Sequence, residues 1–260
     1  AASEPEGKDL AVDIKAALRD KMIDRKSLTL VIKDKPAPKP AAATEHAAPA
    51  APAEAPAPAK ARARARAADG PGATAAHAPW IVERNGVRIA LLGYVEFKPR
   101  SFEADASRPG VAWSGEDDDV IEDIIAARRV HRADIVIPFM HWGWEDEPDP
   151  SPRLRAFARR MIDAGADLVV GGHPHVTQGA EYYRGKPIIY SLGNFLFNGF
   201  DTPATTTGWV LSARVDRTGV VDWRTHVARL DANGVPHRDP TASSPCASPD
   251  RKVVNQCAGE

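Results

Sequence analysis

The sequence is poor in cysteine, contains no long apolar run and carries almost no net charge. Cys246 and Cys257 are the only two cysteines among 260 residues, which excludes a disulfide scaffold and leaves no CxxC pair for zinc. No apolar stretch approaches the roughly 20 residues of a membrane span, so we expect no transmembrane segment in this chain. Lys and Arg number 34 against 35 Asp and Glu. This balance excludes nucleic-acid binding driven by overall basicity.

The composition changes sharply after the first 35 residues. Between residues 36 and 79, Ala or Pro occupies 30 of 44 positions. Proline blocks helix propagation and removes backbone donors, so residues 36–78 are predicted to be a disordered linker. Within it, basic residues alternate with alanine from Lys60 to Arg66. That pattern is typical of a solvated linker, and it also suits a contact site for an anionic polymer or lipid surface.

Both ends of the chain look weakly structured. Residues 1–35 are predicted to form a helix and a strand of unknown role, too short to bury a core alone. The predicted helix has one apolar face, made by Leu10, Ile14, Leu18 and Met22. The predicted strand covers residues 27–32. Residues 235–260 are polar and rich in Pro and Ser, which predicts a disordered tail. Whether Cys246 and Cys257 pair is left open by the sequence.

Residues 79–234 have the texture of a folded domain. Asn85-Gly86 between two apolar runs predicts a β-hairpin over residues 80–93. Short apolar runs then alternate with helical patterns that begin near Ser114 and at Ser151, which indicates an α/β fold with parallel strands. Buried strands are expected at residues 133–140, 167–170 and 186–190. Two longer antiparallel strands are expected at 208–215 and 220–230.

Three histidines stand directly after predicted strands. His141 follows one, while His173 and His175 follow the next. Because the carboxyl ends of parallel strands meet in one crevice, these imidazoles are expected to lie close together, as a divalent transition metal requires. Glu145, Asp146 and Glu147 are near enough in sequence to supply oxygen ligands, or to accept hydrogen bonds from the ligating histidines. The competing interpretation of the Gly-Gly-His-Pro-His run is a plain turn at the end of a strand.

Asn194 follows a third predicted strand. Gly193 before it permits an unusual backbone angle, and the Asn194 amide can point into the same crevice. A structural turn capped by the asparagine is the alternative.

Three segments together resemble the CapA family of bacterial poly-γ-glutamate capsule synthesis proteins, part of the calcineurin-like metallophosphoesterase superfamily. They are His141–Glu145, Gly165–Gln178 and Lys186–Phe195, in the order and at the intervals of that family. The likeness extends over about residues 79–230. It implies a partial metallophosphoesterase-like α/β sandwich, the C-terminal half of the family's fold, and a role in capsule or poly-γ-glutamate biosynthesis with a metal-dependent phosphoesterase-type site.

The resemblance also assigns roles to individual residues. His141 is similar to the superfamily's single metal-binding histidine, and His173 and His175 to its paired histidines. Glu145 and Asn194 resemble supporting catalytic residues. The implied cofactor is a divalent ion, Mn, Fe or Zn, acting on a phosphate-type ester or amide. The implied partners are an anionic polymer such as poly-γ-glutamate or other capsule proteins, and the implied location is the cell envelope, on the outer side of the cytoplasmic membrane or in the periplasm.

The sequence departs from the family at its start. The Gly-Asp, Asn-Leu-Glu and Asn-Asn-His motifs that supply the other metal ligands are missing, and no asparagine precedes Asn85. We therefore expect an incomplete site and, unless something covers it, an exposed apolar sheet face or edge. The alternatives to a metal-dependent hydrolase are a non-catalytic binding or assembly component for an anionic surface polymer, and a truncated fragment of the family.

Overall fold

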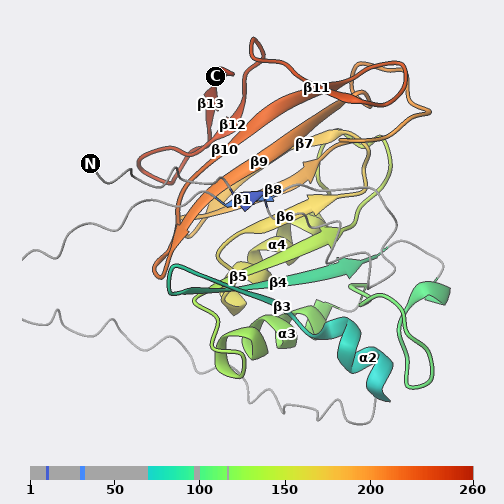
Figure 1. Cartoon of the computed structure of the whole chain (residues 1–260), viewed down its shortest axis with the longest axis vertical. Helices are drawn as coiled ribbons and strands as arrows, with labels where there is room; N and C mark the ends of the chain where they lie inside the picture. Colours follow the sequence, from blue (N-terminus) through green and yellow to red (C-terminus); the bar gives the residue numbers. More distant parts are fainter. Residues whose placement is uncertain (1–9, 12–29, 33–69, 97–99, 116, 260) are drawn as a thin grey trace, which may run out of the picture.

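The computed structural model describes residues 10–11, 30–32, 70–96, 100–115 and 117–259 (Figure 1). The helices are α2 (Gly70–His77), the short 3-10 helix η2 (Arg100–Phe102), α3 (Asp117–Arg129) and α4 (Pro152–Ala164). The strands are β1 (Leu10–Ala11), β2 (Leu30–Ile32), β3 (Trp80–Arg84), β4 (Val87–Val95), β5 (Ile135–His141), β6 (Val169–Gly172), β7 (Thr177–Tyr183), β8 (Lys186–Leu192), β9 (Thr207–Asp216), β10 (Gly219–Leu230), β11 (Pro236–Arg238), β12 (Ser244–Cys246) and β13 (Asn255–Cys257).

A six-stranded sheet forms the centre of the fold, in the order β3-β4-β5-β6-β8-β7. Its inner pairs β4–β5, β5–β6 and β6–β8 are parallel, and its outer pairs are antiparallel. The β3–β4 hairpin turns at Asn85 and Gly86, both at positive φ, as two-residue hairpin turns require. The predicted α/β class with parallel strands is confirmed. Strand β7 was not predicted.

Both faces of this sheet are buried. Consecutive residues of a strand point to opposite faces, so the inner strands β4, β5, β6 and β8 each contribute to two apolar clusters. Ala90, Val136 and Ile188 pack with α3 and α4, whereas their neighbours Ile135 and Ile189 pack against β9 and β10. Figure 1 shows the β9–β10 hairpin on one side of the central strands and α3 on the other. The sheet face that we expected to be exposed unless something covers it is covered by the long β9–β10 pair.

Helix α4 begins and ends as its sequence predicts. Ser151 caps α4 by accepting a hydrogen bond from the Leu154 backbone N–H, Pro152 opens the helix, and Gly165 ends it at φ 120°. Helix α3, predicted to begin near Ser114, begins at Asp117, and the buried Ser114 hydroxyl has no hydrogen-bond partner among the described residues. Helix α3 has three aspartates in its first turn and two arginines in its last, which suits the helix dipole. No helix in the described ranges is long and apolar enough to cross a bilayer.

The predicted linker ends earlier than expected. Gly70–His77 is helix α2. Pro71 stands in its first turn, where proline is tolerated, and three of its last five residues are alanine, which favours helix. Docking is through His77, whose Nδ1 lies 2.6 Å from an Asp123 carboxylate oxygen that also accepts from the Tyr94 hydroxyl at 2.9 Å. Residues 36–69, the remainder of the predicted linker, lie outside the described residues.

The N-terminal prediction is tested only at its edges. Leu10 and Ala11 form β1, paired antiparallel with β2, rather than starting a helix. The other residues of that predicted helix lie outside the described part of the chain. The last three residues of the predicted strand form β2, which pairs in parallel with β9, and residues 27–29 lie outside the described residues.

The tail differs from the predicted disorder. Strands β11 and β12 pair with β10, β13 pairs with β12, and a disulfide joins Cys246 to Cys257. Ser244 donates its hydroxyl proton to the Thr225 carbonyl at 2.8 Å. The polar composition wrongly predicted disorder, because this segment is held by strand pairing and one disulfide rather than by an apolar core of its own.

Candidate metal centre

The three histidines gather at the carboxyl ends of β5 and β6. His141 is the last residue of β5 and pairs in register with Gly172, the last residue of β6. The centres of the His141 and His173 rings are 4.5 Å apart, and those of His173 and His175 are 6.0 Å apart. Parallel pairing of two neighbouring strands thus brings these side chains together.

Three potential ligand atoms form one cluster, from Glu145, His173 and His175. All three lie within 4.8 Å of one another, and His175 Nε2 is 3.8 Å from Glu145 Oε1. Two ligands bonded to one ion at about 2.1 Å lie at most about 4.2 Å apart, so small side-chain adjustments close this group on an ion. Two imidazoles and one carboxylate are a common ligand set for a catalytic divalent metal with an open coordination position. The residues present therefore fit a single ion.

Asn194 fixes the protonation pattern of His175. The Asn194 amide nitrogen donates to the carbonyl oxygens of His175 (3.1 Å) and Thr205 (2.9 Å), which identifies it as the nitrogen. The Asn194 Oδ1 atom therefore faces His175 Nδ1, at 2.8 Å, and Nδ1 must carry the proton. In the neutral form of the ring, the lone pair is then on His175 Nε2, the atom that faces Glu145 and would bind a cation.

Close backbone packing holds the histidine segment in place. Trp142 is completely buried and donates its indole N–H to the Tyr190 carbonyl at 2.9 Å. A Cβ on Gly171 would lie 2.0 Å from that carbonyl oxygen and 2.4 Å from Trp142 Nε1, so only glycine fits. His173 and His175 both take positive φ, 100° and 61°, which this packing maintains.

The loop that carries Glu145 is tied to the histidine segment. The Asp146 backbone N–H donates to the Pro174 carbonyl at 2.8 Å. Gln178 is almost completely buried and donates its amide to the Glu147 carbonyl at 2.8 Å. Glu145 itself is exposed. Two hydrogen bonds therefore position an exposed carboxylate over a buried imidazole.

A pocket of about 70 Å³ opens beside the cluster, lined in part by His141, His173 and His175. Phe197 and Phe200 form an aromatic wall, with ring centres 5.1 and 4.9 Å from that of His175. Sequence reasoning missed this wall; the aromatic run after Asn194 was the available signal.

The structure places the predicted site residues in different ways. Glu145, predicted as a supporting residue, belongs to the group of close ligand atoms, together with His173 and His175. His141 contacts His173 but is not in that group, so its metal role stays a prediction. Asn194 is not in the group either; its Oδ1 accepts a hydrogen bond from His175 Nδ1, the ring nitrogen that does not face Glu145. Among the described residues, no second group of three potential ligands comes together.

Comparison with known proteins places these features in context. Residues 68–199 match the family described as Bacterial capsule synthesis protein PGA_cap. The PGA biosynthesis protein CapA of Bacillus subtilis (strain 168) is 46% identical over 114 residues, which are 44% of this chain and 29% of that protein. The capsule biosynthesis protein CapA of Bacillus anthracis is 42% identical over 116 residues, 44% of this chain and 28% of that protein. The match thus spans less than a third of either relative.

Among solved structures, the sulfate thiohydrolase SoxB of Thermus thermophilus superposes with a TM-score of 0.40 and 18% identity. The superposition covers 58% of this chain and 24% of that chain. A likeness this weak supports no conclusion about chemistry.

Proposed function

This chain belongs to the bacterial capsule synthesis protein PGA_cap family, and we propose that it serves capsule or poly-γ-glutamate biosynthesis through one divalent metal site. Glu145, His173 and His175 are the proposed ligands. Mn, Fe and Zn all suit two imidazoles and a carboxylate. A bound ion would act as a Lewis acid toward a phosphate-type ester or amide and would lower the pKa of a bound water.

The observation that carries this proposal is the arrangement around His175. Its Nδ1 proton is donated to Asn194, its Nε2 lies 3.8 Å from Glu145 Oε1, and its side chain is only 9% exposed. A histidine serving only as a core residue needs no carboxylate facing its unprotonated nitrogen. Hydrogen bonding behind the ligand raises its basicity and fixes its orientation.

The residues around the proposed metal site would have different roles toward a bound substrate. Phe197 and Phe200 cover one side of His175 and keep water from it. Glu145 lies on the open side, where a substrate would approach. His141, whose ring centre is 4.5 Å from that of His173, would contact a bound oxyanion or complete the ligand set.

A non-catalytic role is the second candidate. Only one three-ligand group is present in the described ranges, and a large arginine-lined pocket lies elsewhere on the domain. A chain that holds an anionic surface polymer during assembly, without cleaving it, has the same features.

We place this activity in the cell envelope, outside the cytoplasm. The Cys246–Cys257 disulfide supports this location, because disulfides persist in oxidising compartments and are rare in the cytosol. Alkylation of free thiols in freshly lysed cells tests it: both cysteines should resist the reagent until a reductant is added, and labelling without reductant would argue for the cytoplasm.

The metal proposal is tested on the purified full chain by elemental analysis and by hydrolysis of bis-p-nitrophenyl phosphate. We expect close to one Mn, Fe or Zn per chain, lost in His175→Ala and retained in the matched control His237→Ala, whose ring is exposed and paired with Asp231. Metal-dependent hydrolysis that fails in His175→Ala supports the hydrolase. Metal binding without hydrolysis supports the binding role, and a chain that takes up no ion overturns the metal site.

A further inference from the structure

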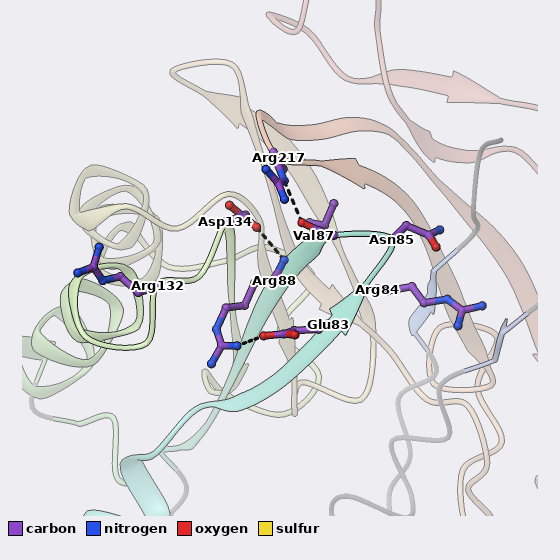
Figure 2. Close-up of a pocket in the computed structure, with 9 residues that line it drawn as sticks. Glu83, Arg84, Asn85, Val87, Arg88, Arg132, Asp134 and Arg217 are labelled. Atoms are coloured by element: carbon purple, nitrogen blue, oxygen red, sulfur yellow. Dashed lines mark hydrogen bonds and ion pairs between the residues drawn. The ribbon is translucent and has the colours of Figure 1, made fainter. Parts of the chain in front are cut away.

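A pocket of about 390 Å³ lies at the end of the central sheet opposite the histidines, and four arginines line it. Arg84 and Arg88 come from the β3–β4 hairpin, Arg132 from the loop before β5, and Arg217 from the β9–β10 turn (Figure 2). Its volume is within the range of ordinary ligand sites. Three segments far apart in sequence therefore contribute one type of cation to a single pocket.

The two acidic residues of the pocket are already engaged. Glu83 pairs with the Arg88 guanidinium, and the Asp134 carboxylate accepts from the Arg88 backbone N–H at 2.8 Å. The Arg88 Nε atom donates to the His131 carbonyl at 2.6 Å. Arg88 is thus a fixed part of the wall rather than a free ligand.

Arg132 and Arg217 remain available to a ligand. Arg217 uses only its Nε, which donates to the Gly86 carbonyl at 2.8 Å, and so presents its two terminal nitrogens. Arg132 is exposed at a positive φ of 56°, and its side chain makes no hydrogen bond or ion pair within the described residues. Among the residues that line the pocket, four arginines thus stand against two acids, both of which contact Arg88.

We propose that this pocket binds a chain of repeated carboxylates. The guanidinium fork matches a carboxylate with two parallel hydrogen bonds, and the bond that already holds Arg217 Nε reduces the entropy which that side chain loses on binding. Cations supplied by three segments around a largely exposed pocket suit successive groups of an extended polyanion better than one small buried anion. The choice of polycarboxylate rests on the proposed role in poly-γ-glutamate synthesis.

The pocket is physically separate from the metal centre. Strand β5 runs from Ile135, next to the pocket, to His141 at the metal centre. Its seven residues extend over about 23 Å. A polymer bound at the arginines would leave the histidine cluster open.

The test measures anisotropy of a fluorescent γ-linked glutamate decamer on the full chain, with a chelator present. The double variant Arg132→Ala/Arg217→Ala should bind at least about tenfold more weakly, because hydrogen bonds to charged groups are lost. The matched control is Arg184→Ala/Arg238→Ala, which removes two exposed arginines outside the pocket and changes the net charge equally. It should bind within about twofold of the parent.

Other outcomes decide against the proposal. Equal loss in both double variants would show that the decamer follows overall charge alone. Displacement of the decamer by micromolar inorganic phosphate would make the pocket a phosphate site instead. Binding that persists in His175→Ala, while metal is lost, separates this pocket from the metal centre, so that failure of either proposal can be recognised by itself.

Discussion

The two ends of the central sheet are built from the same strands but hold their polar side chains in opposite ways. At the carboxyl ends of β5 and β6, the backbone before the histidines is tightly packed at Gly171, and His175 is buried and hydrogen-bonded to Asn194. At the amino end of β5, Arg132 and Arg217 extend from exposed turns. The first end suits a metal ion, which demands ligands at fixed distances, and the second suits a flexible polyanion, which tolerates variation.

The largest expected effect is a loss of stability on substitution at the carboxyl end of β6, where the backbone is tightly packed. Gly171→Ala puts a methyl group 2.0 Å from the Tyr190 carbonyl oxygen, and neither backbone can move without breaking the sheet. We expect unfolding free energy to fall by about 3 kcal/mol, measured by urea denaturation. Gly179→Ala, where nothing lies within 4 Å, is the control. Similar losses in the two variants would show that strand propensity rather than packing dominates.

A smaller effect, on metal affinity, is expected when the hydrogen bond that orients His175 is removed. Asn194→Ala removes the acceptor of the His175 Nδ1 proton, so the ring loses its fixed tautomer and orientation. Affinity for Zn, measured by competition with a chromophoric chelator, should fall about 10- to 100-fold. Asn198→Ala, an exposed change in the same loop, should leave it unaltered. Undiminished affinity in Asn194→Ala would mean that packing alone orients the imidazole.

Substitution beside the arginine pocket should lower the unfolding free energy less than substitution at Gly171. Gly86→Ala strains a residue at φ 74° and should cost about 1–2 kcal/mol in urea unfolding, with no change in metal affinity. Gly185→Ala, at φ 72° in the β7–β8 turn, should cost nearly the same. A much larger loss at Gly86 would reveal that the arginine pocket is as tightly packed as the metal centre.

The smallest expected effect is on the pH dependence of stability, and it comes from Glu96. The Glu96 backbone N–H donates to the carbonyl of His141, at the end of the sheet that carries the metal centre. Burial raises the pKa of Glu96, partly opposed by Arg153. The folded state therefore holds this proton more tightly than the unfolded state, and stability falls as pH rises through the raised pKa.

Glu96→Gln should accordingly be slightly more stable than the parent at pH 7.5, and the difference should vanish below the ordinary pKa of glutamate. Thermal unfolding at pH 7.5 and pH 4 measures both points. A variant less stable than the parent at pH 7.5 would show that the ion pair with Arg153 outweighs burial.

Local signals predicted the elements well where they are self-contained. Asn85-Gly86 specified the first hairpin, Ser151 and Gly165 bounded α4, and the apolar runs marked β5 and β8. The tail and α2 were mispredicted, because polar or alanine-rich segments gain structure only by pairing with β10 or through the His77–Asp123 contact.

The sequence by itself determined the α/β class and the placement of His141, His173 and His175 after strands, since alternation, capping residues and turn residues act over a few positions. Tertiary structure alone decided that β9 and β10 cover the central sheet, that Asn194 holds the proton of His175, and that four arginines from three segments share one pocket. These outcomes depend on contacts between residues distant in the chain, which local periodicity does not encode.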